Sequence, residues 1–159
     1  MKKIFVCVIL FFNMYLINAQ EDFKYYLPEG VSEDSLINII INNGGINEYK
    51  LISLYYFGNK PIAAILPYSL IMANKWNYPP AMLEVYQSLL LLYNCSFYQN
   101  IEVMDKKFRN IALEYLIMYY ENANEGKQKE YIRKFDIPNY IEKGYLKEQN
   151  GKFVIVESK

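Results

Sequence analysis

Few side chains in this 159-residue sequence could do acid–base or nucleophilic chemistry. Histidine is absent, which excludes Ser–His and Cys–His nucleophile pairs and every histidine-ligated metal site. Cys7 lies in the apolar N-terminal segment, so Cys95 is the one cysteine in the rest of the chain. We expect Cys95 to pack as a small buried apolar residue. A disulfide between two chains and a reactive thiol are the alternatives.

Acidic residues provide another route to chemistry, because general acid–base catalysis needs two carboxylates in one pocket. Glu114 and Glu121, seven positions apart, lie on the same side of a helix. Asp105 is equally typical of a helix N-cap, and Glu102 is the fourth acid in this region. A carboxylate-dependent hydrolase is thus one alternative. Our prediction is a protein that is not an enzyme and has no catalytic residue, cofactor or metal.

Aromatic residues indicate a different kind of site, since the chain holds 17 tyrosines and one tryptophan. Two sets of three residues follow i, i+4, i+7 spacing and therefore share a helix face. Tryptophan and tyrosine often supply most of the binding energy at protein interfaces. Packing of these side chains between helices is the alternative. The predicted partner-binding residues are Tyr68, Met72, Lys75, Trp76, Tyr115, Tyr119 and Asn122.

These residues belong to a chain whose apolar periodicity is helical. Ser32 and Asp105 are expected N-caps, and Pro80 is expected in the first turn of a helix. Gly58 is expected to end a helix in the left-handed conformation. Pro67 is expected to kink a longer helix, with a new helix starting there as the alternative. The expected helices cover residues 33–43, 47–57, 61–76, 80–93, 106–122 and 127–135, followed by one more helical turn after Pro138 that Gly144 ends.

Residues 144–159 change to a two-residue period around Asn150-Gly151, which predicts a β-hairpin. A lone hairpin is marginally stable, so it must pack on the helices. Short turns between helices bring neighbours into antiparallel pairs. The predicted fold is all-α: a short α-solenoid of three antiparallel helix pairs over residues 32–143, with an extended lead-in at 20–31 and a small C-terminal β-hairpin.

Two blocks of the sequence, 66–72 and 113–118, share a Leu-X-Tyr start and a following Met. Ile52 departs from the glycine that Sel1-like repeats prefer, and the 94–104 loop lengthens one unit. Over residues 32–135 the chain nevertheless resembles tetratricopeptide or Sel1-like repeats. That resemblance implies a scaffold that binds proteins or peptides in a groove, without a cofactor. Its further matching positions are Leu51, Tyr55, Gly58, Ala64, Tyr68, Ala73 and Ala81.

The first residues have the order of a secretory signal peptide: Lys2-Lys3, an apolar run over 4–16, and small Ala19 before Gln20. The run is too short to span a bilayer. We predict a signal peptide at residues 1–19, cleaved near Ala19/Gln20, and a periplasmic or secreted protein without membrane insertion after cleavage.

The net charge of the chain limits which class of partner it can bind. Two of the 17 Lys and Arg residues and none of the 17 Asp and Glu residues lie in the signal, so residues 20–159 carry a net charge of −2. Nucleic acid, which requires a concentrated basic face, is not an expected partner. We predict an exported, non-catalytic module whose Tyr/Trp-rich face binds another protein or peptide. A periplasmic immunity protein that neutralises a toxin is the alternative.

Overall fold

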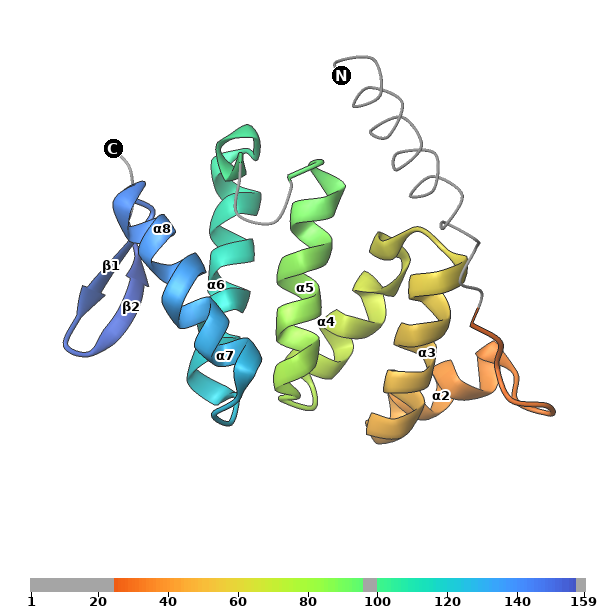
Figure 1. Ribbon diagram of the computed structural model, residues 1–159. Helices are drawn as coiled ribbons and strands as arrows, with labels where there is room; N and C mark the ends of the chain where they lie inside the picture. Colours follow the sequence, from red (N-terminus) through yellow and green to blue (C-terminus); the bar gives the residue numbers. More distant parts are fainter. Residues whose placement is uncertain (1–24, 96–99, 157–159) are drawn as a thin grey trace, which may run out of the picture.

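The computed structural model describes residues 25–95 and 100–156, so the predicted signal peptide lies outside the described residues. This part is mostly helical and ends in an antiparallel two-stranded hairpin, as predicted (Figure 1). Residues 25–31 precede the first described helix without forming a helix or strand. No helix in these two ranges is both long and apolar enough to cross a membrane.

The helices begin and end close to the predicted positions. Ser32 caps the first, accepting a hydrogen bond from Ser35 N at 3.2 Å, and Asp105 caps α6, accepting from Phe108 N at 3.0 Å. In order, they are α2 (Glu33–Asn43), α3 (Ile46–Asn59), the 3₁₀ turn η1 (Ile62–Ile65), α4 (Leu66–Asn74), α5 (Pro79–Leu92), η2 (Ile101–Val103), α6 (Lys106–Asn122), α7 (Lys127–Tyr131), the π-helical turn η3 (Ile132–Asp136) and α8 (Ile137–Glu142).

Three local expectations were wrong. Pro67 does not kink a long helix; it lies in the first turn of α4, where a missing N–H costs no hydrogen bond. Gly58 lies inside α3, which continues to Asn59. The sixth helix does not stop at Phe135, because η3 joins α7 to α8; the helical turn expected around Pro138 is present as α8, which ends just before Gly144.

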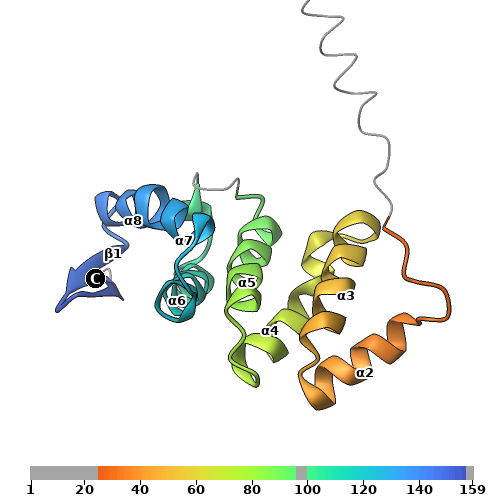
Figure 2. The ribbon, with the colours of Figure 1, turned by 60° about the horizontal axis from the view of Figure 1, so that its bottom comes forward.

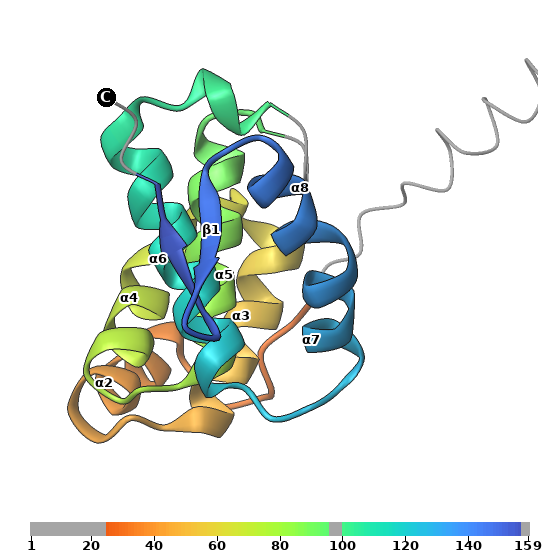
Figure 3. The ribbon, with the colours of Figure 1, turned by 90° about the vertical axis from the view of Figure 1, so that its left-hand side faces the viewer.

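The helices follow one another along the molecule in chain order (Figure 1). In Figure 2, α2, α4 and α6 lie below the helices that follow them, namely α3, α5 and the α7–α8 segment. Figure 3 shows the same division from the end of the molecule. α5 contacts both α4 and α6, and α2 contacts α4 as well as α3. The described helices therefore form two layers.

Tyrosines fill much of the space between these helices. Tyr49, Tyr86 and Tyr140 are among the largest fully buried side chains. The hydroxyls of Tyr86 and Tyr140 lie 2.6 Å apart and share a hydrogen bond, which satisfies polar groups that would otherwise be costly to bury. Tyrosines could serve either to bind a partner or to pack between helices. Tyr49, Tyr86 and Tyr140 pack between helices.

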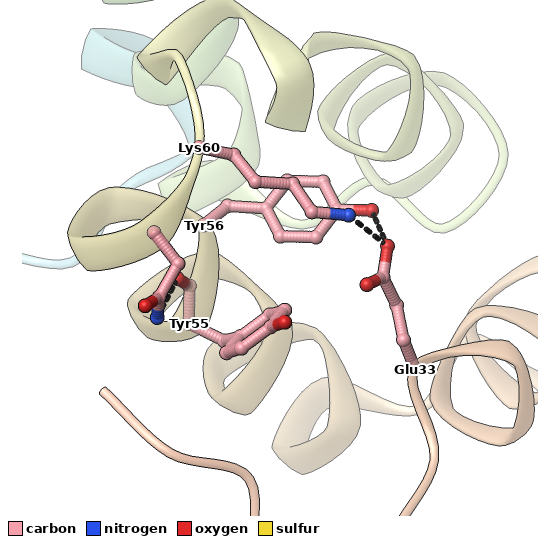
Figure 4. A network of polar contacts seen from close by, with 5 residues as sticks. Glu33, Tyr55, Tyr56 and Lys60 are labelled. Carbon is pink, nitrogen blue, oxygen red and sulfur yellow. Dashed lines mark hydrogen bonds and ion pairs between the residues drawn. The ribbon is translucent and has the colours of Figure 1, made fainter. Parts of the chain in front are cut away.

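A polar network holds the start of α2 against the end of α3 (Figure 4). Lys60 Nζ lies 2.5 Å from Glu33 Oε1, and the Tyr56 hydroxyl donates to the same oxygen. Lys60 Nζ also lies 4.4 Å from the centroid of the Tyr56 ring. The Lys60 hydrogen bond and the Tyr56 hydroxyl together lower the pKa of Glu33. This network joins two helices and leaves the Lys60 charge neutralised.

The C-terminal hairpin packs on the helices, as the sequence required. Strands β1 (Leu146–Gln149) and β2 (Lys152–Ile155) pair with Leu146 opposite Ile155. Asn150 and Gly151 both have positive φ, 55° and 74°, as a tight hairpin turn needs. The Phe153 ring meets Tyr120 of α6 edge to face at 5.3 Å. Leu146 is buried, so the hairpin covers the end of the helical layers.

Candidate functional site

A pocket of about 100 Å³ opens between α3 and α5, next to η1. We call it the Glu84 pocket. Its walls combine apolar side chains with hydroxyl, amide and carboxylate groups. Phe57, on α3, is 67% exposed and lies at the edge of the pocket. The lining residues are Ser53, Phe57, Ile65, Glu84, Gln87, Ser88 and Leu91.

Glu84 is the one charged residue of α5, and helix geometry turns it toward the core rather than the solvent. It is one turn from the buried Ser88 and next to the buried Val85, and its own side chain is half-buried. A carboxylate in such a position needs hydrogen-bond donors. Three hydroxyl groups from two other helices supply them.

Tyr49 and Ser53 donate to the Glu84 carboxylate, and the single hydroxyl proton of Ser69 can reach either this carboxylate or Ile65 O, 3.2 Å away. Ser53 Oγ lies 2.5 Å from Oε1, Ser69 Oγ lies 3.3 Å from Oε2, and the Tyr49 hydroxyl also donates to Oε2. Tyr49 additionally contacts Ser69 Oγ at 2.8 Å. Burial and the negative charge of Glu84 raise the pKa of Tyr49, so its hydroxyl keeps its proton and remains a donor.

No basic side chain pairs with Glu84 in the part of the chain that the structure describes. The ion pairs found there join Glu33 to Lys60, Glu125 to Lys129, Glu130 to Lys134 and Glu102 to Lys143. Three neutral hydroxyls therefore solvate the Glu84 carboxylate without compensating its charge. Chemically, the pocket offers an acceptor-only group beside an apolar wall.

The predicted partner-binding residues of α4 lie elsewhere. Tyr68 is half-buried and meets the Tyr56 ring at 5.9 Å, and Met72 has no exposed surface. Lys75 is exposed; its Nζ donates to Ile41 O at 2.9 Å and lies 4.9 Å from the Trp76 ring. None of these side chains lines the Glu84 pocket.

Trp76 packs under the turn that follows α2 and remains 37% exposed. A Cβ added to Gly44 would come within 2.4 Å of the indole. Gly44 also has a φ of 66°, so only glycine fits the turn and the close approach of the ring together. This geometry is that of a tryptophan joining two helices, the alternative that the sequence left open.

The predicted residues of α6 are mostly interior as well. Tyr115 and Tyr119 are buried, 9% and 7% exposed. The Tyr115 hydroxyl and the Asn74 side chain are hydrogen-bonded at 2.7 to 3.0 Å, which ties α6 to α4. Asn122 is exposed and donates to Met118 O at 2.8 Å. The structure thus brings α4 and α6 together through Asn74, a residue outside the predicted set. Partner binding by the seven residues stays a prediction.

The acids weighed for catalysis are separate from the pocket. Asp105 caps α6 and accepts from the Tyr93 hydroxyl at 2.9 Å; these bonds lower the pKa of Asp105. Glu102 Oε2 lies 3.5 Å from Lys143 Nζ, and Glu114 and Glu121 are exposed. None of the four lines the Glu84 pocket. Cys95 is buried, and burial raises the pKa of its thiol.

A second interior acid lies in the π-helical turn. Asp136 is 2% exposed, and its Oδ1 has no hydrogen-bond partner among residues 25–95 and 100–156. Burial raises the pKa of Asp136 to about 7. π-Helical turns often occur at functional positions, but Asp136 does not line the Glu84 pocket. No group of three or more Cys, Asp or Glu residues in the described ranges could hold a metal ion.

Comparison of the chain with protein-family models, curated proteins and solved structures finds no match. The pocket therefore has to be interpreted from its own geometry. The sequence analysis passed over Glu84, although one signal was available: it is the one charged residue between Lys75 and Glu102. An isolated charge within an apolar helix is rarely placed inside a protein without a partner or a role.

Proposed function

We propose that this chain is an exported, non-catalytic binding module that holds a protein or peptide on the layer formed by α3, α5 and α7–α8. The observation that carries the proposal is the Glu84 pocket, which opens between two helices of that layer. Exposed apolar side chains accompany it: Leu54 is 50% exposed and Phe57 is 67% exposed. Apolar patches beside a polar pocket are typical of protein-binding surfaces.

The two layers also support the predicted architecture. A short α-solenoid would pair α2 with α3, α4 with α5, and α6 with α7–α8, which is consistent with the order of the helices in Figures 1 and 2. Repeats of the tetratricopeptide or Sel1-like kind use such layers as scaffolds. Export follows from the signal peptide proposed at residues 1–19. The intact mass of the purified natural protein would test it, with a mature chain starting at Gln20 as the expected result.

Site-specific photo-crosslinking can test which layer binds the partner. A photoreactive phenylalanine analogue would replace Phe57 on α3 or, as the matched position on the other side, Trp76 after α4. Both side chains are exposed. We expect cells expressing the protein from its own gene to give a discrete adduct from position 57 and none from position 76.

An adduct from position 76 alone would indicate that the partner binds at the residues predicted from the sequence and not at the Glu84 pocket. Absence of an adduct at both positions would overturn the proposed function. If the adduct contains a toxin encoded by a neighbouring gene, the result would support the alternative that this chain is an immunity protein.

A further inference from the structure

The Glu84 pocket has the composition of a site for one long basic side chain. Phe57, Ile65 and Leu91 provide apolar surface, and the Glu84 carboxylate provides a negative charge. Tyr49 and Ser69, two of its hydrogen-bond donors, are buried at 2% and 0% exposure. The carboxylate is therefore fixed from the interior side by these hydroxyls, while Ile65 is buried and Phe57 is exposed.

The hydrogen bonds of Glu84 leave room for one more donor. A carboxylate can accept about four hydrogen bonds. Oε2 accepts from Tyr49 and Ser69, whereas Oε1 accepts from Ser53. The free acceptor position is thus on Oε1, and Ser53, its one donor, itself lines the pocket. An ammonium or guanidinium group there would also compensate the charge.

The size of the pocket favours a single side chain. Its volume of about 100 Å³ is well below the roughly 300–1,000 Å³ of typical cofactor and small-molecule sites. An anionic group would be repelled by Glu84. A purely apolar group would exclude water from the carboxylate without replacing its hydrogen bonds, which is unfavourable. Lysine and arginine avoid both costs, because an aliphatic stem carries their charge.

We propose that the Glu84 pocket binds a lysine or arginine side chain of a protein partner, with the cation at Glu84 Oε1 and the stem against Phe57, Ile65 and Leu91. The inference rests on the proposed function, since it names the chemistry of the partner at the same surface. It assigns recognition to Glu84 and leaves Tyr49, Ser53 and Ser69 as positioning residues for its carboxylate.

Short blocked peptides provide a direct test, because each charged residue has a neutral analogue of similar shape. Peptides with a central lysine or arginine between glycines would be compared with peptides carrying norleucine or citrulline. Binding would be followed through the backbone amide NMR signals of Ser53 and Ser88. We expect the charged peptides to bind about tenfold more tightly than their neutral analogues. Equal binding of charged and neutral peptides would overturn the proposal.

Glu84→Gln should remove this preference while keeping a side chain that can accept from Ser53. The matched control is Glu114→Gln, which changes an exposed glutamate of α6 and should leave peptide binding unchanged. If Glu84→Gln does not fold, Phe57→Lys is the second variant. Phe57 is exposed, so the substitution should be tolerated, and its ammonium would compete at the pocket. Unchanged binding of the charged peptides by either folded pocket variant would contradict the inference.

The outcomes separate this inference from the proposed function. Crosslinking of a partner at position 57, together with equal retention of that partner by wild type and Glu84→Gln, would keep the proposed function and overturn the basic-side-chain site. Sedimentation of wild type and Glu84→Gln tests a second copy of this chain as the occupant. If wild type is a dimer and Glu84→Gln is a monomer, the pocket binds a side chain of the second copy, and the proposal of a different protein partner is overturned.

Discussion

Glu84 and Asp136 are two carboxylates that folding withdraws from water, and their surroundings differ. Glu84 accepts hydrogen bonds from Tyr49, Ser53 and Ser69 at the wall of a pocket. Asp136 is 2% exposed, does not line the Glu84 pocket, and has an Oδ1 without a hydrogen-bond partner in the described residues. The first carboxylate accepts hydrogen bonds on both oxygens, whereas one oxygen of the second is buried without a partner in the described residues.

The difference concerns what surrounds each carboxyl: hydroxyl donors and a pocket at Glu84, and burial at Asp136. Hydroxyls fixed around Glu84 stabilise its carboxylate in one orientation and leave an acceptor position free for a ligand. At Asp136 no hydrogen bond from the described residues replaces the lost hydration of Oδ1, and burial raises the pKa of the carboxyl to about 7. We therefore expect Glu84 to determine what the protein binds and Asp136 to determine how its stability depends on pH.

The largest expected effect comes from removing the acceptor at the centre of the Glu84 cluster. Glu84→Ala leaves the buried hydroxyls of Tyr49 and Ser69 with fewer partners, and we expect it to lower the free energy of unfolding by about 2–3 kcal/mol. Glu114→Ala, an exposed glutamate in the middle of α6, is the matched control. Urea unfolding would measure both. Equal losses in the two variants would mean that the donors around Glu84 contribute nothing specific.

The pH dependence of the free energy of unfolding tests whether burial raises the pKa of Asp136. Its folded pKa of about 7 lies above the ordinary 3.8, so the folded protein binds the proton more tightly than the unfolded chain does. Stability should therefore fall as pH rises from 3.8 to 7 and level off above that. The expected loss between pH 5 and pH 7 is about 2 kcal/mol.

Asp136→Asn should flatten this slope, and unfolding series at several pH values would measure the change. The carboxylates with lowered pKa values, such as those of Glu33 and Asp105, have the opposite dependence. Their contributions are lost as pH falls below about 4.5, outside the window used. A slope between pH 5 and pH 7 that persists in Asp136→Asn would assign the titration to another group.

A smaller effect is expected from Tyr49→Phe, which removes one donor from Glu84 and leaves the aromatic ring in place. We expect a loss of about 1–2 kcal/mol, because Glu84 loses a hydrogen bond and the buried Ser69 hydroxyl loses its contact with the Tyr49 oxygen. Tyr120→Phe is the control, since the described contacts of Tyr120 are made by its ring. Thermal unfolding followed by circular dichroism would compare the two. A larger loss in Tyr120→Phe would reverse the expected order.

The smallest effect should come from Ser53→Ala, because Ser53 lines the pocket and is only half-buried. Water can replace the hydroxyl there, so we expect a loss of about 0.5–1 kcal/mol. The same variant frees a second acceptor position on Oε1, and the charged peptides should still bind. Loss of peptide binding without loss of stability would show that Ser53, rather than Glu84 alone, contacts the cation.

Local patterns predicted much of the fold and little of the site. The Ser32 and Asp105 caps and the Asn150-Gly151 turn were correct, because each depends on residues three or fewer positions away. Pro67 was harder to interpret, since a proline is compatible both with a kink and with a first helical turn. Only the preceding 3₁₀ turn η1 decides between them.

The aromatic pattern had two meanings that the sequence could not separate. Tyr115 and Tyr119 follow the spacing of one helix face, and that face is buried. Trp76 looks equally suited to a partner or to a neighbouring helix until Gly44, 32 positions earlier, is seen against its ring. Glu84 was missed because its donors come from positions 35, 31 and 15 residues away.

The sequence alone therefore determined the helical class, most helix ends, the C-terminal hairpin and the absence of histidine chemistry. Each depends on composition or on interactions within one helical turn, which the order of residues specifies directly. The tertiary structure decided which aromatic residues are interior and which acid has donors around it. Those outcomes depend on how α3, η1, α4 and α5 pack together, and packing joins groups whose separation along the chain carries no local signal.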